Sequence, residues 1–163
     1  MKKAALHNLG CKVNAYETEA MQHLLEEAGY EIVPFTQKAD VYVIYTCYVT
    51  NMADRKSRQM LHKAKKNNPD SIVVAAGCYV QTSEKEVLND LSVDIVIGND
   101  RKHDLVRLLE EYSLDSVNDT VDDINDGKQD FEERFIDQTK EHTRAFIKVQ
   151  DGCNQFCSYC IIP

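Results

Sequence analysis

The sequence lacks the features that mark several large protein classes. It contains no Trp, and none of its apolar runs reaches the roughly eighteen residues of a membrane-spanning helix, so no membrane partner is expected. Its first residues turn polar too soon for a signal peptide, which favours the cytoplasm. Neither a Walker loop nor a GxGxxG pattern occurs, so those nucleotide-binding folds have no support. The net charge of -8 argues against nucleic-acid binding by bulk electrostatics.

The negative charge is concentrated in one stretch of the chain. Residues 113–143 hold ten Asp and Glu against three Lys and Arg, a sum of -7. The stretch is polar and has no apolar periodicity, which is typical of a linker rather than of a packed element. We therefore interpret residues 1–112 as one domain, 113–143 as an acidic linker, and 144–163 as the start of a second unit.

The first 112 residues alternate between strand and helix patterns. Apolar runs rich in β-formers predict strands at 3–9, 30–33, 41–45, 72–76 and 93–97. Capping signals and helical spacing predict helices that begin near Asn14 (with Glu17), Asn51, Ser83 (with Glu86) and Asp100, with Gly29 ending the first. This alternation predicts an α/β fold with an open, mostly parallel sheet flanked by helices.

Three scattered cysteines share one predicted structural position. Cys11, Cys47 and Cys78 each come one to three residues after a predicted strand, and Gly10 and Gly77 precede two of them. The carboxyl ends of parallel strands lie along one edge of a sheet, where such folds bind ligands. Without a signal peptide, cysteines are more often metal ligands or catalytic groups than disulfides. We therefore expect the three thiols to converge.

The residues leave the identity of this thiol site open. A three-thiolate iron–sulfur site is the functional interpretation. Three free cysteines that merely pack in the interior are an alternative, because cysteine is among the most buried residue types. A zinc site is a second alternative, but structural zinc takes four ligands, and His7 is only a weak candidate for the fourth.

A second, tight cysteine trio follows a predicted strand at 145–149. Cys153, Cys157 and Cys160 form a CxxxCxxC pattern. Iron–sulfur clusters usually take four thiolates, so a three-thiolate loop leaves one iron of a [4Fe-4S] cube free for a substrate or cofactor. The spacing matches no common zinc pattern, and the nearest histidine, His142, precedes the strand.

Together these motifs resemble the radical S-adenosylmethionine methylthiotransferase family, and most closely its bacterial branch that acts on threonylcarbamoyladenosine in tRNA. The matching segments are Leu9–Asn14 (LGCKVN), Thr46–Thr50 (TCYVT), Asp54–Gln59 (DRKSRQ), Gly77–Cys78 and Gly152–Pro163 (GCNQFCSYCIIP), and the resemblance covers essentially the whole chain. Two positions depart from the pattern. Tyr45 stands where Asn usually precedes Thr-Cys, and Ala76 stands where Thr usually precedes Gly-Cys.

The resemblance implies a fold and a set of cofactors. Residues 1–112 would be the family's N-terminal domain, and 144–163 the first strand and cluster loop of a truncated radical barrel. Two [4Fe-4S] clusters and S-adenosylmethionine are implied, one cluster on the tight trio and one on the scattered trio. Tyr159 would lie near the cofactor's adenine, although a packing role is as compatible with a tyrosine. The partners would be tRNA and a reductant such as flavodoxin or ferredoxin.

The resemblance also implies that these 163 residues alone are inactive, because the family's barrel and RNA-binding domain would follow them. Methylthiolation of isopentenyladenosine or of a ribosomal protein is an alternative within the family. A non-enzymatic zinc or redox α/β module is the alternative outside it. A basic run in the predicted helix after Cys47 is a candidate RNA contact, or simply a solvated face: Arg55, Lys56, Arg58, Lys63, Lys65 and Lys66.

Overall fold

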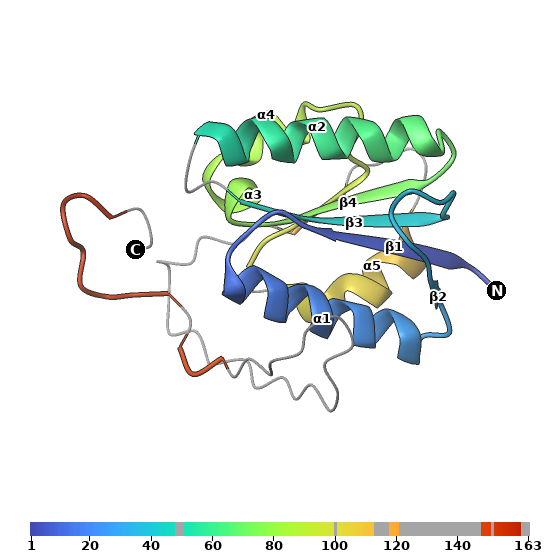
Figure 1. Ribbon diagram of the computed structural model, residues 1–163, viewed down its shortest axis with the longest axis horizontal. Helices are drawn as coiled ribbons and strands as arrows, with labels where there is room; N and C mark the ends of the chain where they lie inside the picture. Colours follow the sequence, from blue (N-terminus) through green and yellow to red (C-terminus); the bar gives the residue numbers. More distant parts are fainter. Residues whose placement is uncertain (48–50, 100, 113–117, 121–147, 151, 161–163) are drawn as a thin grey trace.

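The chain forms one parallel sheet with helices on both faces (Figure 1). The computed structural model describes residues 1–47, 51–99, 101–112, 118–120, 148–150 and 152–160. The strands are β1 (Lys3–Asn8), β2 (Glu31–Ile32), β3 (Val41–Thr46), β4 (Ile72–Gly77), β5 (Ile95–Ile97) and β6 (Asn118–Thr120), in the spatial order β2-β1-β3-β4-β5-β6. All pairs are parallel, so the predicted open α/β fold is confirmed.

The helices form two layers that bury the sheet between them. They are α1 (Lys12–Glu27), α2 (Asn51–Asn67), α3 (Cys78–Thr82), α4 (Glu84–Leu88) and α5 (Leu105–Glu111), with a 3-10 turn, η1 (Lys102–Asp104), before α5. In Figure 1, α2 and α4 lie over one face, and α1 and α5 lie over the other. No helix among the described residues is long and apolar enough to cross a membrane.

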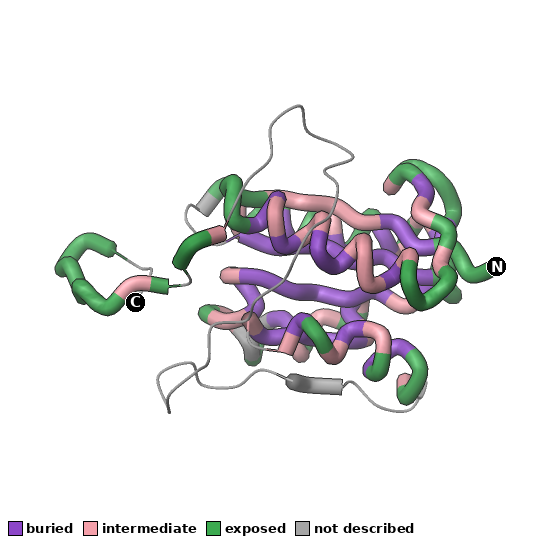
Figure 2. Tube along the Cα trace, turned by 90° about the horizontal axis from the view of Figure 1, so that it is seen from below, coloured by how far each residue is buried: buried purple, intermediate pink, exposed green. Residues whose placement is uncertain are grey.

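The central strand β3 shows why two layers are needed. All its residues are buried, and successive side chains point to opposite faces. Tyr42 and Ile44 pack with Leu61 of α2 in one core, whereas Val43 packs with Leu25 of α1 in the other. Figure 2 shows the buried residues concentrated in the strands and on the inner sides of the helices. A continuous apolar run is the expected sequence of such a strand.

The predicted start of α1 is wrong in its detail. The helix begins at Lys12 with Cys11 as its N-cap residue, so Asn14 lies inside the first turn. The Asn14 side chain is buried and donates a hydrogen bond to the carbonyl of Thr46 instead of capping the helix. Glu17 is also buried, in an ion pair described below. Tertiary contacts have taken both side chains away from the predicted capping box. The predicted end is confirmed, with Gly29 at φ +85 just beyond the helix.

Other predicted boundaries were only partly confirmed. Ser83 precedes α4, but its side chain makes no capping hydrogen bond, and the short helix α3 before it was not predicted. Asp100 lies outside the described residues, and Asp104 is the residue that precedes α5. Of the predicted strand at 145–149, residues 145–147 also lie outside them, while Lys148 and Val149 have no regular secondary structure.

The sheet also extends into the range assigned to the acidic linker. Residues 118–120 form β6, which pairs in parallel with β5. The remainder of residues 113–143 lies outside the described part of the chain. An edge strand of three residues, Asn-Asp-Thr, has no apolar alternation by which a sequence pattern would reveal it.

Candidate metal centre

The three scattered cysteines follow three neighbouring strands of the sheet. Cys47 comes directly after β3, Cys78 directly after β4, and Cys11 three residues after β1. β1 pairs with β3, and β3 pairs with β4, with Thr46 and Gly77 in register. The predicted position at the carboxyl edge of the sheet is therefore where the structure places all three residues.

The thiols differ in exposure but influence one another. Cys47 is buried, Cys78 is half-buried and Cys11 is exposed, so simple interior packing accounts for Cys47 alone. Burial raises the pKa of the Cys78 thiol, the neighbouring Cys47 and Cys11 raise it further, and the Lys102 ammonium lowers it. Two thiols can act on the pKa of a third only at short range, which places the trio within one small region.

Hydrogen bonds tie the strand ends at this edge to one another and to the helices. The Thr46 hydroxyl donates to the carbonyl of Ala76 at 2.6 Å, and the Asn14 amide donates to the carbonyl of Thr46 at 3.2 Å. The buried Ser57 hydroxyl of α2 lies 3.3 Å from both the amide nitrogen and the carbonyl oxygen of Cys47. These contacts fix the backbone that carries Cys47 between the two flanking strands.

Gly77 has a backbone conformation that the turn into α3 requires. Its φ of 98 and ψ of -167 lie in a region that essentially only glycine adopts. A Cβ atom there would lie 2.5 Å from the Thr46 carbonyl oxygen and 2.9 Å from the Tyr45 ring. The missing side chain therefore lets β4 turn sharply at Cys78 while remaining close to β3.

A buried group of charged side chains lies near the same edge. Lys102 of η1 and Glu17 of α1 form an ion pair at 3.3 Å, and their side chains are 3% and 2% exposed. Lys148 donates to the same Glu17 carboxylate oxygen and is 8% exposed. The Lys102 ammonium also lies 5.5 Å from the centre of the Tyr45 ring. Sequence analysis missed these residues, because buried lysines carry no pattern that separates them from exposed ones.

The tight trio lies in a segment of turns. Cys153 is half-buried, while Cys157 and Cys160 are exposed, and the amide of Cys160 donates to the carbonyl of Cys157 at 3.0 Å. Tyr159 is 91% exposed, so no described residue packs over it as interior packing would require. Figure 2 shows this segment as largely exposed.

The donor groups at the sheet edge fit an iron–sulfur cluster. The groups that act on Cys78 there are two further thiols and one ammonium, and thiolates are the usual ligands of such clusters. Among the described residues, no three His, Cys, Asp or Glu side chains are arranged to hold a single metal ion. His7 instead packs in β1 against Phe35, with ring centres 4.9 Å apart, and burial lowers its pKa.

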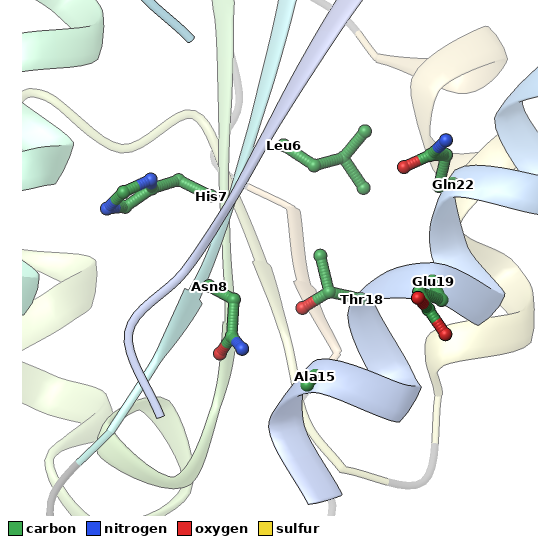
Figure 3. Close-up of a pocket in the computed structure, with 7 residues that line it drawn as sticks. All are labelled: Leu6, His7, Asn8, Ala15, Thr18, Glu19 and Gln22. Atoms are coloured by element: carbon green, nitrogen blue, oxygen red, sulfur yellow. The ribbon is translucent and has the colours of Figure 1, made fainter. Parts of the chain in front are cut away.

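Two further features lie apart from the cysteines. A polar pocket lies between β1 and α1, and His7 points away from α1 across the strand (Figure 3). None of the cysteines lines this pocket. On α2, Lys65 binds Asp94, whereas the other basic residues are exposed: Arg55, Lys56, Arg58, Lys63 and Lys66.

The fold and its cysteines define a class: an open parallel α/β domain with three thiols at its carboxyl edge, followed by a CxxxCxxC loop. The sequence pattern of the family described as "Uncharacterized protein family UPF0004" matches residues 3–98, and the chain belongs to this family. All of the chain is 45% identical to a threonylcarbamoyladenosine tRNA methylthiotransferase MtaB of Bacillus subtilis, and 99% of it is 42% identical to the protein of that name from Aquifex aeolicus.

A tRNA-2-methylthio-N(6)-dimethylallyladenosine synthase of Ehrlichia canis is 31% identical over the whole chain. The chain spans 36%, 39% and 38% of the lengths of these three relatives, respectively. It therefore matches the part of each relative that corresponds to the α/β domain and the cysteine loop.

Proposed function

We propose that the chain is the N-terminal part of a tRNA methylthiotransferase that adds sulfur and a methyl group at C2 of threonylcarbamoyladenosine, next to the anticodon. The observation that carries the proposal is the convergence of Cys11, Cys47 and Cys78 on three adjacent strand ends, in a chain that also carries CxxxCxxC. The identity of 45% to a relative named for this substrate, against 31% to one named for dimethylallyladenosine, supports the choice of substrate.

In this proposal each cysteine trio holds one [4Fe-4S] cluster. Cys153, Cys157 and Cys160 would leave one iron open for S-adenosylmethionine, with Tyr159 beside its adenine. Cys11, Cys47 and Cys78 would hold the cluster that carries the sulfur to be inserted. When bound, the clusters and S-adenosylmethionine supply the radical and sulfur-transfer chemistry, using electrons from a reductant such as flavodoxin or ferredoxin.

The role of this chain's own residues is to hold and separate the two sites. The strand ends fix Cys47 and Cys78 through the Thr46 and Ser57 hydrogen bonds, so the backbone at the edge is preorganised. The CxxxCxxC loop is exposed, which leaves its face accessible to the rest of the enzyme and to tRNA. We further propose that residues 1–163 do not complete the reaction alone, because they cover little more than a third of the relatives' length.

Modification of isopentenyladenosine is the second candidate, favoured by the relative named for the dimethylallyl substrate. A zinc or redox module without enzymatic activity is the candidate of another class, since six thiols also suit zinc.

Nucleoside analysis of tRNA tests the substrate. A strain in which the gene is deleted should lose the methylthio group on threonylcarbamoyladenosine and keep the one on isopentenyladenosine. The intact gene should restore it, and residues 1–163 alone should not. Loss on isopentenyladenosine would identify the second candidate, and unchanged nucleosides would contradict the proposal. Restoration by residues 1–163 would show that the segment is active alone.

A further inference from the structure

The charged group beside the three-cysteine edge has no role in the function proposed above. We propose that Lys102, held by Glu17, supplies a buried positive charge that raises the reduction potential of the cluster at Cys11, Cys47 and Cys78. The inference rests on the proposed function, because it needs a cluster on that trio. It assigns Lys102 as a positioning residue that acts on the cluster through the protein.

The contacts within the group show that its charge is retained. Glu17 lies between two ammonium groups: Lys102 at 3.3 Å, and Lys148, which donates to the same oxygen. All three side chains are at least nine-tenths buried. A lysine with a carboxylate partner keeps its proton in such surroundings, whereas an unpaired one tends to lose it. The three groups sum to one positive charge.

Tyr45 connects this charge to the cysteine edge. Its ring faces the Lys102 ammonium at 5.5 Å and also lies against the Cα of Gly77, the residue before Cys78. Tyr45 itself is two residues before Cys47, and Glu17 is less than two helical turns from Cys11. The effect of Lys102 on the Cys78 thiol agrees with this proximity. The charge thus lies behind the strand ends that carry the trio.

A buried cation at this place acts on redox chemistry by simple electrostatics. A thiolate-held cluster becomes more negative when it accepts an electron, and its potential depends on the charges and hydrogen bonds around it. Charges buried in protein interact more strongly than charges in water. A lysine beside the cluster therefore favours the reduced form. An ion pair that only stabilises the fold would affect unfolding and leave the potential unchanged.

The test is a redox titration of a single cluster. In the 163-residue chain, Cys153, Cys157 and Cys160 are replaced by Ala, so that one cluster is reconstituted anaerobically on the first trio. Dithionite supplies the electron, and electron paramagnetic resonance measures the reduced fraction. Lys102→Met should lower the ratio of reduced to oxidised cluster about tenfold at a fixed potential, a shift of about 59 mV toward negative values. Lys102→Arg, which keeps the charge, should stay near the parent.

Lys65 provides a matched control. It is also a partly buried lysine in an ion pair, 2.6 Å from Asp94, but it lies near the opposite end of β4 and bonds the carbonyl of Ser71. Lys65→Met should leave the potential unchanged. Lys148→Met, which removes a positive charge from the same group, should shift it in the same direction as Lys102→Met and decides the matter if the latter does not fold.

Three results would overturn the inference. One is a Lys102→Met variant, or failing that a Lys148→Met variant, whose fully loaded cluster keeps the parent potential. Another is a Lys65→Met variant that shifts as far as Lys102→Met. The last is a parent chain that binds no cluster on the first trio, which would also remove the proposed function. The first two results leave the proposed function intact.

Discussion

Gly77→Ala is expected to lower the free energy of unfolding by at least about 3 kcal/mol. The new side chain would have to adopt a glycine-only conformation, and its Cβ would lie 2.5 Å from the backbone oxygen of Thr46. Neither strain can relax without moving β3 and β4 apart, because Thr46 is bound to Ala76 across that pair. The same movement would displace Cys78, so the variant should also bind less iron at the sheet edge.

Gly29→Ala is the control for this prediction. Gly29 also has a positive φ, +85, but no atom lies within 4 Å of the Cβ it lacks. Its replacement therefore carries the backbone strain alone, about 1 kcal/mol. Urea denaturation of both variants measures the two losses. Equal losses would contradict the account of close packing at Gly77.

Glu17→Gln is expected to destabilise the protein by about 3–5 kcal/mol, because it leaves two buried lysines without their carboxylate. The volume of the side chain is nearly unchanged, so packing contributes little. Denaturation by urea at neutral pH gives the difference from the parent protein.

The double variant Glu17→Gln with Lys102→Met separates charge from packing. Removing one partner of a buried pair is costly, whereas replacing both by neutral groups of similar shape is much less so. We therefore expect the double variant to be more stable than Glu17→Gln alone. A double variant less stable than the single one would contradict the ion-pair account, since the Lys102 ammonium would then not be the group that needs Glu17.

The strands and their cysteines were predictable because burial on both faces leaves a clear record. Continuous apolar runs at Val41–Tyr45 and Ile72–Ala76 located β3 and β4 to within one residue. Parallel topology then placed Cys47 and Cys78 at one edge without any knowledge of side-chain contacts. The family motifs added Cys11, which the structure places after the neighbouring strand.

The polar interior of the site was not predictable in the same way. Asn14 and Glu17 have the spacing of a capping box, and local sequence cannot show that strand ends and a distant lysine use those side chains instead. Lys102 lies in a charged stretch that is typical of a solvated turn, yet its side chain is only 3% exposed. Such residues are assigned by long-range contacts, which leave no periodic pattern in the chain.

The identity of Tyr45 gains meaning from these contacts. It departs from the family pattern at a position next to a proposed ligand, and its ring is the surface against which both Lys102 and Gly77 lie. An asparagine could not provide such a face. This chain thus has an aromatic ring between its buried cation and the cysteine edge.

The most direct test of the central claim is a metal and sulfide analysis of the chain in which Cys153, Cys157 and Cys160 are replaced by Ala. After anaerobic reconstitution, a [4Fe-4S] cluster on Cys11, Cys47 and Cys78 predicts about four irons and four sulfides per chain, and further replacement of Cys47 by Ala should abolish both. Zinc bound without sulfide, or iron that survives the loss of Cys47, would contradict it.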